Sequence, residues 1–205
     1  RTHRRYFERV FTLMPEEYSS QISSLQVFTG ADLAFDAFVE TLPPRYDTWR
    51  YSILEDAMGN VNSLPTTELI IHELGHIVSL EALPGRQKRY TSDCNSYFDT
   101  SSCPPVNSYF AKFIAEFWSE DDLARAERFA ESGNQWQLVE DYYVQHESDF
   151  VTEYAGINPA EDFAESFMYY VMDYETDGEL DTDKIDFFTD YSEMRAIKDF
   201  VRNQI

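Results

Sequence analysis

The stretch Thr67–Leu80, TELIIHELGHIVSL, decides the fold, because it predicts a helix with one apolar face and one chemical face. His72 and His76 are four residues apart, so on a helix of 3.6 residues per turn both imidazoles project from one face. We therefore expect a helix over about residues 65–82, bounded by Pro and Gly signals. Its apolar positions recur at helical spacing, and they are Ile70, Leu74, Ile77 and Val78.

Glu73 completes the pattern H-E-x-x-H, in which two histidines bind a zinc ion and the glutamate is the general base of a metallopeptidase. The chain holds 4 His in 205 residues, so a chance match is on the order of one in a hundred. The alternative is a surface helix with two solvated histidines. Gly75 inside the helix costs roughly 1 kcal/mol relative to Ala, which indicates that another backbone or the ligand shell approaches there.

Composition narrows the class of protein. A chain of 205 residues with 43% hydrophobic and 16% aromatic residues predicts a single domain, residues 1–205, with a large core. The net charge of −22 argues against nucleic acid and anionic membranes as partners, and no apolar run is long enough for a membrane helix. The charge either favours neutral or basic substrates or serves solubility alone. We expect a monomer that acts on a peptide or protein.

Cys94 and Cys103 flank a short polar loop. A disulfide closing it would contribute about 2–3 kcal/mol by restricting the unfolded chain, and it would imply an oxidising compartment. Two free thiols in a cytosolic protein are the alternative. With only two cysteines, a zinc site built from cysteines is not expected.

The order of elements predicts an α+β fold. A helix is expected over residues 1–23, followed by strands at 24–30, 33–40 and 49–54, which are short and rich in aromatic and β-branched residues. Helical spacing returns after Val106, with a strong helix at about 158–174 and two further helices after Asp181. Residues 1–82 would form a sheet lobe that carries the H-E-x-x-H helix, and residues 83–205 a mainly helical lobe.

A third metal ligand must come from elsewhere, since a catalytic zinc takes three protein ligands and keeps one position open. His3 and His146 are better explained as solvated or structural residues. Glu161 and Glu165 are four apart on the expected 158–174 helix and share one face. One would bind the metal, and the other would accept the free N–H of a ligating histidine.

A capping box is the alternative role for Glu161, with Asn158 as its partner at the start of the helix. A second acidic pattern, Asp173-x-Glu175-x-Asp177-Gly178, imitates the start of an EF-hand loop. Its twelfth position is Lys184 rather than Glu, so an acidic turn is expected there and calcium binding through another geometry stays open.

Together these motifs resemble a known family. H-E-x-x-H followed by Glu161-x-x-x-Glu165 on a later helix resembles the gluzincin zinc metallopeptidases. The phrase YAGINPAEDFAE, which begins at Tyr154, is similar to the lethal-factor-like branch, where a tyrosine stands seven residues before the glutamate ligand. The stretches 49–60 and 184–205 resemble a group of secreted bacterial zinc metallopeptidases, so the resemblance covers residues 25–205.

The resemblance implies a zincin-like fold, export from the cell, and one Zn²⁺ per chain bound by His72, His76 and Glu161. It also implies Glu73 as general base, Tyr154 as a donor to the substrate carbonyl oxygen, and Glu165 as the partner of a ligating histidine. A non-catalytic, zinc-stabilised binding module and a cytosolic metallopeptidase-like regulator are the alternatives. Glu73 and Tyr154 favour the enzyme, because a binding module needs neither, although Tyr154 could instead be one of 14 tyrosines packing a loop.

Overall fold

The computed structural model describes residues 2–30, 35–44, 47–80, 104, 107–176, 178 and 180–205. Cys94 and Cys103 lie outside these ranges, so their disulfide stays a prediction. Within the described ranges, no helix combines the length and the apolar character needed to cross a membrane.

Three strands form one mixed sheet in the order β1-β3-β2. β1 (Ile22–Phe28) pairs with β3 (Trp49–Leu54) in parallel, and β2 (Ala37–Thr41) pairs with β3 antiparallel. The central strand has the bounds expected from its sequence, because Trp, Tyr and Ile alternate on a buried face. The two outer strands are displaced by a few residues from the expected 24–30 and 33–40.

The expected helix over residues 1–23 is wrong in its extent. α1 (Thr2–Leu13) ends before Pro15, and α2 (Glu16–Ser19) is a separate short helix. Pro15 is extended, with φ −53° and ψ 147°, because the residues around a proline are restricted and its nitrogen cannot donate a helical hydrogen bond. The break frees the chain to begin β1 at Ile22.

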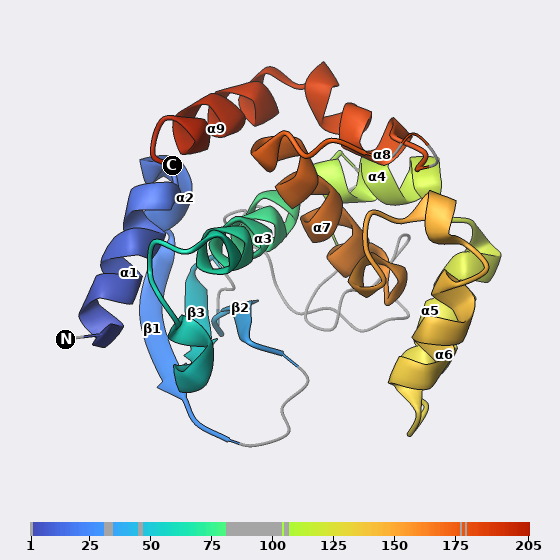
Figure 1. Ribbon diagram of the computed structural model, residues 1–205, viewed down its shortest axis with the longest axis horizontal. Helices are drawn as coiled ribbons and strands as arrows, with labels where there is room; N and C mark the ends of the chain where they lie inside the picture. Colours follow the sequence, from blue (N-terminus) through green and yellow to red (C-terminus); the bar gives the residue numbers. More distant parts are fainter. Residues whose placement is uncertain are drawn as a thin grey trace.

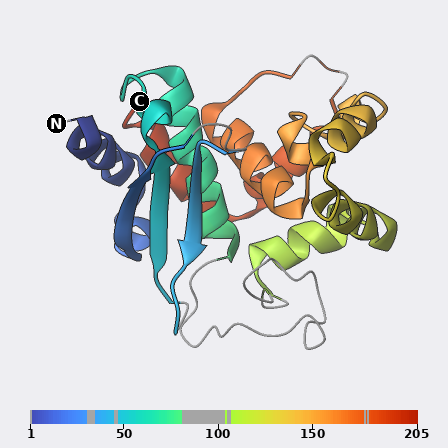
Figure 2. The same cartoon turned by 90° about the horizontal axis from the view of Figure 1, so that it is seen from below.

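α3 (Leu64–Leu80) is the H-E-x-x-H helix, and it packs across the inner face of the sheet (Figure 2). Its core face is fully buried, as the apolar spacing predicts, through Ile70, Ile71, Leu74, Ile77 and Val78. α1 covers the same side, where the buried hydroxyls of Tyr6 and Tyr51 lie 2.9 Å apart. The sheet and α1 therefore fix the position of α3.

The second half of the chain is helical, as expected. Its helices are α4 (Tyr109–Phe117), α5 (Glu120–Ala130), α6 (Gln135–Tyr143), α7 (Pro159–Met172), α8 (Asp183–Asp186) and α9 (Ser192–Arg202). Figure 1 shows α3 and α7 side by side in the middle of the molecule, with the sheet on one side and α4 to α6 on the other. The chain is thus α+β, with a small mixed sheet and a larger helical part.

Aromatic side chains hold α7 in place. Phe163 lies 5.3 Å from Phe113 of α4 and 5.1 Å from Phe188, measured between ring centroids, in edge-to-face contacts. Phe167, one turn later, lies 5.5 Å from the Phe188 ring. Such pairs each add about 0.5–1.5 kcal/mol beyond the burial of area. This cluster leaves the opposite face of α7 turned toward α3.

Candidate metal centre

The start of α7 is capped in a way that fixes its first turn. The Asn158 side-chain oxygen accepts hydrogen bonds from the backbone N–H of Ala160 at 2.8 Å and of Glu161 at 3.1 Å. Pro159 occupies the first helical position, as the sequence predicts. The Glu161 side chain does not fold back to close a capping box. It extends toward α3 instead.

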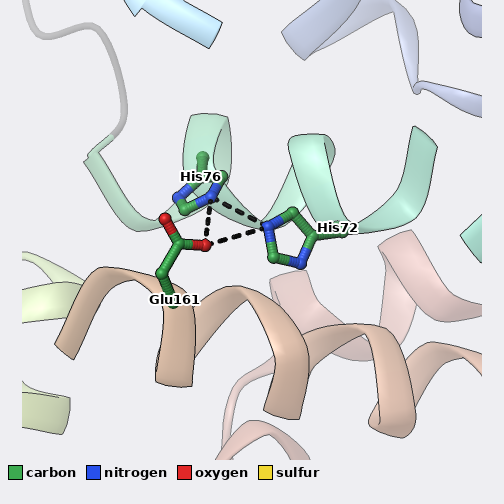
Figure 3. A group of neighbouring side chains, drawn as sticks. All are labelled: His72, His76 and Glu161. Atoms are coloured by element: carbon green, nitrogen blue, oxygen red, sulfur yellow. Dashed lines mark hydrogen bonds and ion pairs between the residues drawn. The ribbon is translucent and has the colours of Figure 1, made fainter. Parts of the chain in front are cut away.

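Glu161 meets the two histidines of α3 at one point (Figure 3). Its Oε2 atom lies 3.1 Å from His72 Nε2 and 3.3 Å from His76 Nε2, and the two Nε2 atoms are 3.1 Å apart. Zinc bonds of 2.0–2.2 Å in a tetrahedral site separate ligand atoms by about 3.3 Å. The three donors are therefore spaced as ligands of a single metal ion are.

Gly75 allows the two helices to come this close. A Cβ atom at Gly75 would lie 3.0 Å from the Ala164 Cα and 3.2 Å from the Phe167 ring. Both distances are tighter than nine in ten real Cβ contacts, so the neighbouring atoms would have to shift by a few tenths of an ångström. Gly75 thus allows α7 to approach α3 at Ala164, which lies about one turn after Glu161, the third donor.

Glu165 orients His72. His72 Nδ1 donates to Glu165 Oε1 at 2.6 Å, which leaves Nε2 turned toward Glu161 and His76. A second oxygen of the same carboxylate, Oε2, accepts a 2.7 Å hydrogen bond from the Thr152 hydroxyl. A carboxylate on the outer nitrogen of a ligating histidine fixes its tautomer and ring orientation.

The charges within this group are set by burial and by one another. Burial opposes a charge on His72, but the hydrogen bonds to Glu161 and Glu165 outweigh it and hold the pKa of His72 well above its ordinary value. The pKa of His76 is raised in the same way, by Glu161 against burial. For Glu161, burial favours the neutral acid, but the two histidines prevail and its pKa lies well below the usual range.

Glu73 is the buried carboxylate beside this group. It is only 2% exposed, and its Oε2 atom is buried without a hydrogen-bond partner. Burial raises the pKa of Glu73, although His76, His72 and a hydrogen bond from the Val39 backbone act to lower it. An unpartnered buried oxygen costs free energy, about 1–3 kcal/mol, so its presence next to three converging donors points to a bound water or ligand.

The Tyr154 ring contacts His72. The two rings meet edge to face with centroids 5.8 Å apart, and Tyr154 also stacks with Trp136 at 6.1 Å. Burial raises the pKa of the Tyr154 phenol, and the charges of Glu161 and Glu73 raise it further. The phenol therefore keeps its proton and can act as a hydrogen-bond donor.

A pocket of about 650 Å³ opens beside His72 and Glu73. Its wall also includes Tyr154, Glu165 and Tyr169, and its volume lies within the range of small-molecule and peptide side-chain sites. Among the described residues of the wall there are four carboxylates and no Lys or Arg. The pocket therefore reaches His72 and Glu73 along an acidic wall.

The other candidate residues lie elsewhere. His3 contacts Glu55 at 2.8 Å, and His146 contacts Asp149 at 2.9 Å while stacking on Tyr142. In the described part of the chain, His72, His76 and Glu161 are the only group arranged for a metal ion. In the EF-hand-like segment, Asp173 caps α7 and pairs with Lys198, whereas Asp177 lies outside the described residues.

Sequence reasoning missed a buried ion pair next to Glu161. Asp162 is fully buried, and its Oδ2 accepts from Lys184 Nζ at 2.7 Å and from the Trp118 indole at 2.9 Å. Burial raises the pKa of Asp162 to about 6, against the lowering effects of Lys184 and Trp118. The pair joins α8 to the first turn of α7. Only the unusual Asp at a core position of the helix could have hinted at it.

Comparisons of the chain with protein-family models, with curated proteins and with solved structures each found no match. The interpretation of this group of side chains therefore rests on its geometry and chemistry.

Proposed function

We propose that the protein is a zinc-dependent peptidase of zincin-like fold, with zinc bound by His72, His76 and Glu161. The single observation that carries the proposal is the convergence of these three donors, 3.1–3.3 Å apart, beside the buried and unpartnered oxygen of Glu73. A purely structural zinc site is closed by four protein ligands. Within the described residues this group has three donors, and the Glu73 carboxylate lies next to them.

A zinc ion bound there would lower the pKa of a water molecule and polarise a substrate carbonyl. Glu73 would accept the proton of the attacking water and deliver it to the leaving amine, a role for which its raised pKa is suited. The Tyr154 hydroxyl would donate to the carbonyl oxygen as charge develops on it. Glu165 would keep the His72 ring in place throughout.

An extended peptide is the substrate form that the surroundings favour. β2 pairs with β3 on one side only within the described sheet, and the backbone N–H of its Val39 reaches Glu73. An unpaired strand edge next to the site can bind a peptide by main-chain hydrogen bonds. The acidic wall of the adjoining pocket is compatible with neutral or basic side chains.

The test is Glu73→Gln, which keeps the size of the side chain and removes the proton acceptor. Zinc content, measured by elemental analysis, should stay at one ion per chain, while cleavage of a peptide library should fall by at least ~10²-fold. Equal cleavage by both proteins would exclude Glu73 as the base. A wild-type protein that holds zinc but cleaves no peptide would instead support the binding module.

A further inference from the structure

Thr152 occupies a position between two parts of the metal centre. Its hydroxyl donates to Glu165 Oε2 at 2.7 Å and accepts from the backbone N–H of Ala155 at 3.2 Å. The first bond reaches His72 through the other oxygen of the Glu165 carboxylate. The second bond holds the turn Tyr154–Gly156, which carries the phenol next to His72.

We propose that Thr152 is a positioning residue, whose single hydroxyl couples the orientation of the His72 imidazole to the placement of Tyr154. The inference rests on the metal centre proposed above but concerns a residue outside its three donors. A hydroxyl can donate one hydrogen bond and accept others at once. Among the described side chains, only Thr152 forms hydrogen bonds both to the Glu165 carboxylate and to the backbone of this turn.

The arrangement restricts each partner. Glu165 must accept from His72 and from Thr152 with different oxygens, so its carboxylate plane cannot rotate without breaking one bond. The Tyr154 ring contacts the rings of His72 and Trp136, and its turn is anchored through Ala155. Loss of the Thr152 hydroxyl should therefore loosen the ligand and the phenol together, whereas loss of the methyl group should affect neither.

Zinc affinity measures the first half of the coupling. In a competition titration against a chromophoric chelator, Thr152→Val should bind Zn²⁺ about 10-fold more weakly, the low end of the 10–100-fold cost of losing an outer partner. Thr152→Ser, which keeps the hydroxyl, should bind as the wild type does. Thr41→Val is the matched control, because the Thr41 hydroxyl is also buried but has no hydrogen-bond partner.

Tryptophan quenching measures the second half. Trp136 is 45% exposed, whereas Trp49 and Trp118 are 1% and 6% exposed, so acrylamide quenching reports mainly on Trp136. Thr152→Val should raise the quenching constant of the metal-free protein, because Tyr154 no longer holds the indole. Thr152→Ser should leave it unchanged.

A double mutant tests the route through Glu165. If Thr152 acts on His72 only through that carboxylate, Thr152→Val should cause no further loss of zinc affinity in a Glu165→Leu background. If Thr152→Val lowers zinc affinity equally in both backgrounds, the route through Glu165 is wrong. The proposal is also overturned if Thr152→Val binds zinc as the wild type does, or if Thr152→Ser loses as much zinc affinity as Thr152→Val. If Thr152→Val does not fold, Thr152→Ala takes its place with the same expectations. A wild-type protein without zinc affinity would instead refute the metal centre itself.

Discussion

At the scale of single residues, Glu161 is the group that turns two histidines into a three-donor site. Glu161→Ala should weaken zinc binding by more than about 100-fold, because losing a direct ligand costs more than losing an outer partner. His146→Ala is the control, since His146 contacts Asp149 and Tyr142 away from the site. Zinc titration of both variants tests this assignment. Full zinc affinity in Glu161→Ala would show that Glu161 is not a ligand.

Tyr154 can be tested by removing one oxygen atom. Within the described residues its hydroxyl has no hydrogen-bond partner, so Tyr154→Phe should leave zinc content and the melting temperature unchanged. The contact with the carbonyl oxygen would form only in the transition state, and kcat should fall by ~10–10³-fold. Steady-state kinetics together with a thermal melt separate a catalytic phenol from a packing role. A packing role predicts a normal kcat and about 1 kcal/mol of lost stability.

At the scale of elements, the contact between α3 and α7 decides whether the donors can meet. Gly75→Ala gains about 1 kcal/mol of helix propensity, but its Cβ would press on the Ala164 backbone, and such overpacking costs about 1–3 kcal/mol. We therefore expect a net loss of stability on the order of 1 kcal/mol and a weaker zinc affinity as the helices separate. Thermal melts and zinc titration measure the two effects.

Gly133→Ala is the matched control, because nothing lies within 4 Å of a Cβ atom at that position. It should change neither the melting temperature nor the zinc affinity. A Gly75→Ala variant that is more stable than the wild type and binds zinc equally well would show that this glycine does not set the distance between the helices.

The elements also show where sequence reasoning succeeds and where it cannot. The helix expected at 65–82 is found at Leu64–Leu80, because its periodicity is strong and Pro65 fits its first turn, while residues 81 and 82 lie outside the described ranges. Pro15 was the signal that divides the expected 1–23 helix, and the apolar residues on either side obscured it. Thr152 could not be predicted, because its partner Glu165 lies 13 residues away and is reached only through the fold of the 3-10 turn.

At the scale of the whole molecule, the site joins the two halves of the chain. His72 and His76 come from the helix that packs on the sheet, and Glu161 comes from the helical part. The local patterns predict both helices, and the resemblance implies that Glu161 joins the two histidines, which is the group that the structure brings together. A metal that bridges the halves binds only the folded chain, so it must stabilise the fold as a unit.

That stabilisation should depend on pH in a direction set by the histidines. At free zinc 100 times its Kd, the gain is about 2.7 kcal/mol, and this corresponds to about 5–11 °C in Tm for a chain of this size. In the unfolded chain His72 and His76 titrate near 6.5, and in the metal-free fold their pKa values are raised. Their contribution to metal-free stability is therefore complete below pH 6.5 and is lost as the pH rises through the raised values.

Zinc affinity depends on pH in the opposite direction to metal-free stability. The metal requires neutral imidazoles, so below the raised pKa values it must displace one or two protons. Below the raised pKa values, the zinc affinity should fall by about 10–100-fold for each unit by which the pH is lowered. The Tm difference between the zinc-loaded and the metal-free protein should thus widen as the pH rises above 6.5. Melts at fixed free zinc between pH 5.5 and 8.5, from about one unit below to about two units above the ordinary histidine pKa, measure this difference. A constant difference across the range would contradict the coupling of zinc to these two histidines, and a difference that narrows with rising pH would reverse its sign.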